Sequence, residues 1–258
     1  MERIQKQREV TVSLAFRPPF RWSAIAGFLA TRAIAGIETF DGTRYERAGV
    51  CIEPNGSNSL KMSVRSAPQD AVVRARRMFD LDADPVAISE HLGRDRLLRK
   101  LLAKRPGPRV PGGWEPFEIA VRAIVGQQIS VQAATTIMNR LFAGGRFNDS
   151  ALGGMPKSRI EAIRTLVRTF ADDPSILTRG ATLDESIERL TALKGVGPWT
   201  AHYIAMRALR EPDAFPHTDL GLKKAAIAIG IDPDKLLARA ERWRPFRAYA
   251  AIALWESL

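Results

Sequence analysis

Cysteine is almost absent from this chain of 258 residues, in which Cys51 is the single example. One cysteine excludes an intrachain disulfide framework and also a four-cysteine iron–sulfur cluster. Because Cys51 lies in a stretch of alternating apolar and polar residues, we expect it to be a buried strand residue. Histidine is scarce too, and His91, His202 and His217 lack the spacing of metal ligands.

Long apolar runs are also missing, so the sequence predicts neither a signal peptide nor a membrane-spanning helix. We therefore expect a cytoplasmic protein that does not contact membranes. A hydrophobic content of 45% is typical of a soluble globular protein. At this length the chain has room for one large domain or for two to three small ones.

Acidic residues are too few to balance the basic ones, since 28 Asp and Glu stand against 39 Lys and Arg. The formal net charge of +11 is unevenly distributed, with +2 on residues 1–92 and +9 on residues 93–258. Such a surface suits a polyanion, although basic proteins also bind membranes or acidic partners. The C-terminal two-thirds of the chain is therefore the expected polyanion-binding part.

Alternating apolar residues and Gly-containing turns predict a small α+β unit with an antiparallel sheet in residues 1–92. The expected strands are 10–16, 37–40, 47–52 and 60–64, and the expected helices are 22–34 and 68–79. After residue 92 the apolar spacing is helical, and Gly and Pro separate the segments. The helices expected there are 94–103, 115–126, 130–143, 157–170, 184–193, 198–210, 219–229, 233–242 and 245–256.

The Gly195-Val196-Gly197 turn lies between two of these helices. Thr182 and Glu185 have the spacing of a capping box at the start of the first helix, and Pro198 fits the first position of the second. Two glycines permit a tight turn, so a phosphate could approach the free N–H groups of the second helix. An ordinary helix connection with a glycine cap explains the same residues.

The longer string Leu-x-Gly-Val-Gly-x-x-Thr-Ala, followed by Phe-Pro-x-x-Asp, resembles the helix–hairpin–helix and Gly/Pro–Asp signature of a DNA glycosylase superfamily. More narrowly, the chain resembles the alkylated-base branch, the 3-methyladenine DNA glycosylase II (AlkA-like) family. Related strings cover nearly the whole chain, at 17–22, 79–85, 111–118, 122–130, 241–250 and 254–255.

The resemblance implies a fold and a division into domains. Residues 1–92 would form the N-terminal α+β domain with its antiparallel sheet. Residues 116–217 would form a helical domain with the helix–hairpin–helix at 193–200, and 93–115 plus 218–258 would form a second helical domain that carries Asp219. The active cleft would lie between the two helical bundles.

Asp219 stands at a predicted helix start, where Asp is usually an N-cap. By resemblance it is the catalytic carboxylate, because it occupies the Asp of the Phe-Pro-x-x-Asp string. A cationic alkylated base leaves readily, and a nearby anion stabilises the positive charge that develops on the sugar. Relatives can carry a second acid where this chain has Thr218.

The aromatic residues Phe28, Trp199, Tyr203 and Trp255 match the base pocket of the family, although core packing alone could explain each one. Electron-rich rings would stack on a cationic base through cation–π attraction. Trp199 also occupies the position at which strand-cutting glycosylases carry a nucleophilic lysine, so we expect no lyase activity. Arg32 could point at the same cleft, at phosphate or at solvent.

Double-stranded DNA containing alkylated bases is the implied partner, bound by a monomer at the nucleoid. The resemblance places the DNA contacts at Gln127, Gln128, Lys194, Gly195, Val196, Gly197 and Thr200. Gln128 would be the wedge that fills the gap left by a flipped base, unless it is simply part of a polar loop. We expect His202 to face solvent or DNA.

No cofactor is required by this interpretation, and no iron–sulfur cluster is expected. The resemblance allows one structural monovalent cation at the hairpin, held by the backbone carbonyls of Thr191, Leu193 and Val196.

Three alternatives stay open. A non-catalytic helix–hairpin–helix protein explains the glycines and the charge, but not Asp219 or the first domain. A bifunctional glycosylase-lyase conflicts with Trp199, and a helical interaction domain that ignores nucleic acid would show no salt-dependent DNA affinity.

Overall fold

A five-stranded antiparallel sheet forms the N-terminal part of the protein in a computed structural model that describes residues 9–65 and 67–258. The strand order is β1-β5-β4-β3-β2. The strands are β1 (Val10–Ala15), β2 (Glu38–Phe40), β3 (Tyr45–Arg47), β4 (Val50–Asn55) and β5 (Ser59–Val64). Buried residues recur at every second position, as in Leu60, Met62 and Val64 of β5, so one face of the sheet is covered.

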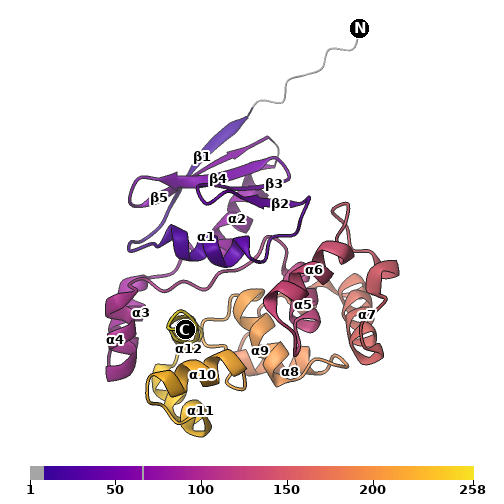
Figure 1. Ribbon diagram of the computed structural model, residues 1–258. Helices are drawn as coiled ribbons and strands as arrows, with labels where there is room; N and C mark the ends of the chain where they lie inside the picture. Colours follow the sequence, from indigo (N-terminus) through magenta and orange to yellow (C-terminus); the bar gives the residue numbers. More distant parts are fainter. Residues whose placement is uncertain (1–8, 66) are drawn as a thin grey trace.

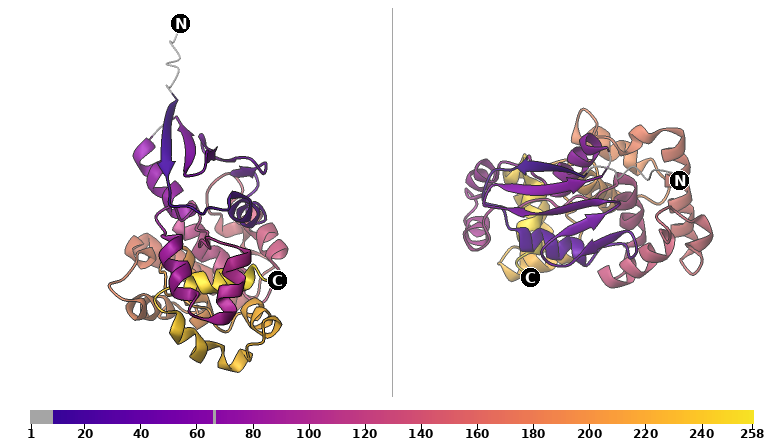
Figure 2. Two further views of the ribbon diagram at one scale, coloured as in Figure 1. Left: turned by 90° about the vertical axis from the view of Figure 1, so that its left-hand side faces the viewer. Right: turned by 90° about the horizontal axis from the view of Figure 1, so that it is seen from above.

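The helices α1 (Trp22–Ala30) and α2 (Pro68–Met78) supply that cover. Ile25 and Leu29 of α1 join Ala75 and Met78 of α2 in one apolar cluster with the sheet residues. Figures 1 and 2 show α1 between the sheet and the helical part of the molecule. The side of α1 that is turned away from the sheet therefore faces the helices. Phe28 of α1 can thus reach the helical part of the molecule.

The expected strand at 47–52 is wrong, because the chain turns within it. Ala48 and Gly49 have φ values of +48° and +78° and connect β3 to β4, with Arg47 opposite Val50. Two consecutive residues with positive φ form the tightest kind of hairpin loop. Sequence reasoning misses the turn because alanine rarely adopts a left-handed conformation.

The remainder of the chain is helical, and its segments follow the predicted ones closely. They are α3 (Pro85–Leu92), α4 (Arg96–Lys104), α5 (Pro116–Val125), α6 (Val131–Leu141), α7 (Lys157–Asp172), α8 (Leu183–Thr191), α9 (Pro198–Arg207), α10 (Leu220–Ala228), α11 (Leu236–Ala240) and α12 (Arg247–Trp255). Short 3-10 turns lie at Asp149–Leu152, Pro174–Leu177, Pro233–Lys235 and Glu241–Trp243.

Two helical predictions need correction. The helix α3 was not expected, although Asp84 caps it and Pro85 occupies its first position. The single helix expected at 233–242 is instead α11 between two 3-10 turns. Pro233 fits the first position of the leading 3-10 turn, which explains the late start of α11.

One connected apolar core runs through the helical part of the chain to Leu254 and includes Ile34 of the N-terminal part. α12 contacts α4 and α10 and is seen end-on among the other helices in Figure 1. Within residues 9–65 and 67–258, no helix combines the length and apolar character needed to cross a bilayer.

Candidate active site

One cleft brings together most of the residues that the sequence predicts for the site. It has a volume of about 1180 Å³ and lies where α1, α9, α10 and α12 face the loop between α5 and α6. The predicted residues that line it are Phe28, Gln127, Gln128, Gly195, Gly197, Trp199, Thr200, Tyr203, Asp219 and Trp255. Because Phe28 and Trp255 are near opposite ends of the sequence, the cleft is a product of the tertiary fold.

Asp219 is held in this cleft by three N–H donors. Its Oδ1 accepts from the backbone N–H of Leu222 and from the indole Nε1 of Trp255, each at 2.9 Å. Its Oδ2 accepts from the indole Nε1 of Trp199 at 3.0 Å. The first bond is the N-cap of α10. The two indoles fix the carboxylate orientation, so capping and a second role are compatible.

Gly221 leaves the room that this arrangement needs. A Cβ at this position would lie 2.9 Å from Asp219 Oδ1 and 3.1 Å from Trp255 Nε1. Both separations are shorter than ordinary van der Waals contact, so a side chain here would displace the carboxylate or the indole. Sequence reasoning misses Gly221, because a glycine inside a helix does not reveal what it faces.

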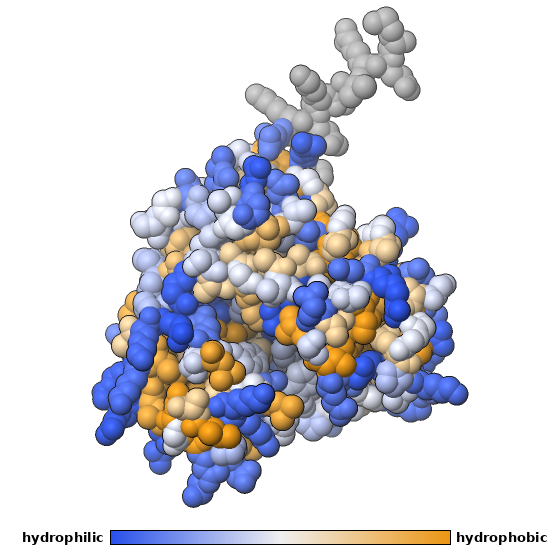
Figure 3. Space-filling model, viewed as in Figure 1, coloured by the Kyte–Doolittle hydropathy of each residue, from blue (hydrophilic) through white to orange (hydrophobic). Residues whose placement is uncertain are grey.

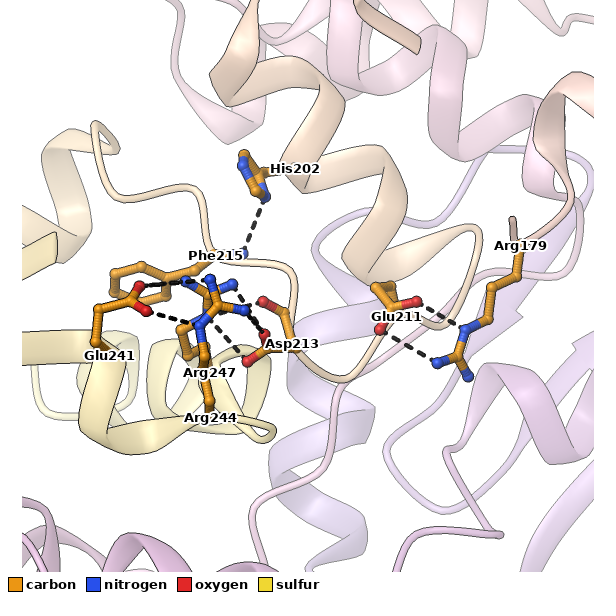
Figure 4. Close-up of polar contacts among 8 residues, drawn as sticks. All are labelled: Arg179, His202, Glu211, Asp213, Phe215, Glu241, Arg244 and Arg247. Atoms are coloured by element: carbon orange, nitrogen blue, oxygen red, sulfur yellow. Dashed lines mark hydrogen bonds and ion pairs between the residues drawn. The ribbon is translucent and has the colours of Figure 1, made fainter. Parts of the chain in front are cut away.

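Ion pairs with buried acidic partners anchor the segment that leads from α9 to Asp219 (Figure 4). Asp213 accepts from Nε and Nη2 of Arg247 at 2.9 Å each, and from Nη1 of Arg244 at 2.5 Å. Glu211, in the same segment, pairs with Arg179 at 2.7 Å. Paired and hydrogen-bonded charges of this kind are costly to separate. The segment is therefore tied to α12 before the chain reaches Asp219.

His202 of α9 also holds this segment, since its Nδ1 accepts a hydrogen bond from the backbone N–H of Phe215 at 3.2 Å (Figure 4). Burial, together with the positive charge of Arg247, lowers the pKa of His202 to about 4. The half-buried imidazole is neutral at pH 7 and accepts a hydrogen bond from the chain itself. The expectation of a residue that faces solvent or DNA does not include this bond.

The rings of Trp199 and Tyr203 stack with centroids 5.4 Å apart and planes 23° apart. The Tyr203 hydroxyl accepts a hydrogen bond from Nη1 of Arg207 at 2.6 Å. Burial raises the pKa of the Tyr203 phenol, but the guanidinium groups of Arg207, Arg32 and Arg122 outweigh burial and lower it overall. One aromatic wall of the cleft is therefore surrounded by positive charge.

The hairpin adopts the tight turn that its glycines predict. Gly195 has a φ of +86°, and a Cβ there would lie 2.5 Å from the Cβ of Ala162 on α7. Gly197 has a φ of −85°, and a Cβ there would meet nothing within 4 Å. Gly195 is therefore required by the turn, and Gly197 leaves an open surface.

That open surface carries free backbone donors. In the described part of the chain, the N–H groups of Gly197, Trp199 and Thr200 donate to no other atom. They lie at the N-terminus of α9, where the helix dipole favours an anion. The geometry fits a phosphate group.

Gln127 and Gln128 lie in the loop between α5 and α6, on one rim of the cleft. Nε2 of Gln127 donates to the Gly195 carbonyl at 3.1 Å and to Thr200 Oγ1 at 2.9 Å, so it joins the loop to the hairpin. Gln128 is exposed and has a φ of +59°, an unusual conformation for glutamine. Its side chain is free to reach beyond the cleft.

The other rim carries Leu220, which is 74% exposed and also lines the cleft. Apolar surface gathers on the α10 and α11 side of the molecule (Figure 3), where Leu220 is joined by Ile227 and Leu237. Sequence reasoning misses Leu220, because the sequence shows only that a leucine follows Asp219 and not that it is exposed. It also misses Arg207, which lies four residues after Tyr203 on α9, and Arg122, whose place near Tyr203 depends on how α5 and α9 pack.

The remaining predicted residues lie outside the cleft lining. Lys194 is exposed and pairs with Glu161 at 2.9 Å. Thr191, Leu193 and Val196 remain predicted cation ligands, and the Leu193 carbonyl accepts from the Val196 N–H at 3.0 Å. Within residues 9–65 and 67–258, no group of three His, Cys, Asp or Glu side chains is placed to hold a metal ion.

Cys51 is half-buried on β4 rather than buried, because its side chain points away from the covered face of the sheet. Burial and the nearby carboxylates of Glu46 and Glu53 raise the pKa of its thiol.

The antiparallel sheet domain, the helical region with a Gly-x-Gly hairpin and the carboxylate in the cleft together define a fold of the DNA glycosylases. A 3-methyladenine DNA glycosylase from Archaeoglobus fulgidus superposes with a TM-score of 0.77 at 18% identity, over 95% of this chain and 97% of that one. The Schizosaccharomyces pombe 3-methyladenine DNA glycosylase, solved in complex with abasic DNA, superposes with a TM-score of 0.58 at 24% identity, over 66% of this chain and 95% of that one.

The chain belongs to the AlkA-like 3-methyladenine DNA glycosylases of the helix–hairpin–helix superfamily. Residues 11–115 match the AlkA N-terminal domain. DNA-3-methyladenine glycosylase 2 of Escherichia coli is 30% identical over 94% of this chain and 96% of its own length. The probable bifunctional transcriptional activator/DNA repair enzyme AlkA of Mycobacterium tuberculosis is 38% identical over 96% of this chain, which spans 57% of that relative.

Proposed function

We propose that this chain is a monofunctional DNA glycosylase of base excision repair, which removes 3-methyladenine, 7-methylpurines and related bases from duplex DNA. The observation that carries the proposal is the Asp219 carboxylate, fixed by the indoles of Trp199 and Trp255 inside an aromatic cleft. Hydrolysis of the N-glycosidic bond would leave an abasic site. Membership of the AlkA-like family supports the same reaction.

The hairpin would hold the DNA in register with the cleft. The open face of Gly197 and the free N–H groups of Trp199 and Thr200 can bind a backbone phosphate. A target base must leave the helical stack before it reaches the cleft. Gln128 on one rim and Leu220 on the other are exposed, and either side chain is long enough to fill the gap.

Asp219 would act on the sugar of the flipped nucleotide. As the glycosidic bond breaks, the departing base keeps the bonding electrons and the sugar carbon becomes positively charged. A carboxylate whose orientation is fixed in advance stabilises that charge without reorganising. It can then orient or deprotonate the attacking water.

Strand cutting by the enzyme itself is not expected. A lyase needs an amine that attacks the sugar, and Trp199 stands where such enzymes carry lysine. The Trp199 indole instead donates to Asp219, so this residue has a defined role in the site.

The decisive experiment is incubation of the purified protein with duplexes that each carry one modified base. We expect strand breaks only after alkali treatment, and no covalent adduct after borohydride reduction. Intact DNA for every lesion, with binding retained, would instead identify a non-catalytic DNA-binding protein. A trapped adduct would contradict the monofunctional mechanism.

A further inference from the structure

The cleft already contains a cation on one of its aromatic walls. The guanidinium carbon of Arg32 lies 3.6 Å from the ring centroid of Phe28, and both residues line the cleft. The guanidinium carbon of Arg207 lies 4.5 Å from the same ring and 5.3 Å from the Tyr203 ring. A planar cation over an aromatic ring is the same contact that a cationic alkylated base would form.

The positive charge in this region has only neutral hydrogen-bond partners. Within residues 9–65 and 67–258, Arg32 donates to the Phe28 carbonyl and to Thr31 Oγ1, both at 3.0 Å. Arg207 donates to Tyr203 and to the carbonyls of Pro111 and Gly112. These contacts satisfy the guanidinium groups without neutralising their charge.

Arg122 adds a third guanidinium group, which donates to the Arg32 carbonyl and to Thr135 Oγ1. Burial lowers the pKa of Arg122 to about 10, with Tyr203 opposing the shift and Arg207 and Arg32 adding to it. Three mutually repelling cations therefore lie close together, with Arg32 and Arg122 lining the cleft and Arg207 buried beside it.

Arg32 is the least anchored member of this group. It lies two residues beyond α1 and donates to Phe28 and Thr31 of its own segment. Its one further side-chain partner in the described residues is Tyr203, which opposes the lowering of the Arg32 pKa by burial. Arg207, by contrast, is buried and donates to residues about 95 positions away. A base that displaces Arg32 from the Phe28 ring therefore has to break only the contact with Tyr203 among the contacts to distant residues.

We propose that Arg32 is a specificity-determining residue, which occupies the Phe28 face until a base enters and disfavours cationic bases relative to neutral ones. This inference rests on the proposed glycosylase activity at the same cleft. A cationic base must displace a like charge and then lie near Arg122 and Arg207. A neutral base must only displace Arg32, which it can do while the guanidinium turns toward solvent or phosphate.

The test compares excision of 7-methylguanine, a cationic base, with excision of hypoxanthine, a neutral one, in the same duplex sequence. For Arg32→Gln we expect the ratio of single-turnover efficiencies, cationic over neutral, to rise by roughly fivefold or more, because a like charge about 4 Å away costs the cationic base at least about 1 kcal/mol and costs the neutral base nothing. The Arg32→Lys variant keeps the charge, so its ratio should stay near the parental value.

The matched control is Arg242→Gln, which removes one positive charge from an exposed position outside the cleft lining. It should leave the ratio unchanged. An unchanged ratio in Arg32→Gln, or an equal rise in either other variant, would overturn the role of Arg32. If the parental protein excises neither base, the proposed function itself fails, and the two failures are thus distinguishable.

Discussion

At the scale of single residues, Asp219 is both the N-cap of α10 and the proposed catalytic carboxylate. The Asp219→Asn substitution keeps one oxygen for the Leu222 N–H and the Trp255 indole, but places an amide N–H₂ against the Trp199 indole. We expect excision to slow by about 10² to 10³, or about 2.7–4 kcal/mol, because the charge that faces the developing cation is lost. Single-turnover assays on 3-methyladenine and ethenoadenine duplexes measure this effect.

Two controls accompany the Asp219→Asn measurement. Thermal melting should stay near the parental value, and affinity for abasic duplex should hold or rise, since an anion near phosphate is removed. If the Asp219→Asn variant melts normally and excises bases at the parental rate, Asp219 is only a helix cap.

Trp255 is predicted to act as an orienting donor as well as a stacking surface. Trp255→Phe keeps an aromatic ring but removes the N–H that donates to Asp219 Oδ1. A hydrogen bond to a charged group contributes about 1.5–3 kcal/mol, so excision should slow by roughly 10- to 100-fold. Trp22→Phe removes an indole bond to the Gly42 carbonyl, outside the cleft, and should not slow excision. Equal rates in both variants would leave Trp255 as a stacking residue alone.

At the scale of elements, the two glycines of the hairpin contribute differently to its stability. Gly195→Ala forces a Cβ into a left-handed conformation, 2.5 Å from Ala162, whereas Gly197→Ala meets open space. We expect the first variant to lose about 1–3 kcal/mol of unfolding free energy and the second to lose little. Denaturant titration of the two variants measures the difference, and equal stabilities would contradict the turn geometry.

The helices and strands also show how much of the secondary structure can be predicted from the sequence. Apolar spacing predicts most helices within a few residues, because burying one face is what stabilises them. It fails at Ala48-Gly49, where alanine adopts a conformation that its side chain disfavours. It also does not reveal that His202 accepts a hydrogen bond from the Phe215 backbone, which is 13 residues away.

Only some residues of the candidate site could be predicted from the sequence. Asp219, the hairpin and the pocket aromatics are predicted from sequence motifs. Arg207, Gly221 and Leu220 are not, because Arg207 meets Phe28 only when α9 and α1 pack together, and Gly221 and Leu220 matter only where α10 and α12 meet at the cleft.

At the scale of the whole molecule, stability should depend on pH through His202. Its pKa in the folded protein is about 4, below the ordinary value of 6.5, so the unfolded chain binds a proton that the folded protein does not. This stabilisation is complete above pH 6.5 and is lost as the pH falls toward 4. We expect the free energy of unfolding to fall less steeply over that window in His202→Gln than in the parental protein, as measured by urea titrations at each pH.

The glutamine carbonyl in that variant can still accept the Phe215 N–H, so stability near pH 7 serves as the control. An identical slope in both proteins would mean that other groups carry the pH dependence in this range.

The two indole donors of Asp219 come from α9 and from the last residue of α12. During synthesis, the hairpin and Asp219 leave the ribosome before Trp255 does. Full orientation of the Asp219 carboxylate therefore requires that α12, which is synthesised after α10, packs against it.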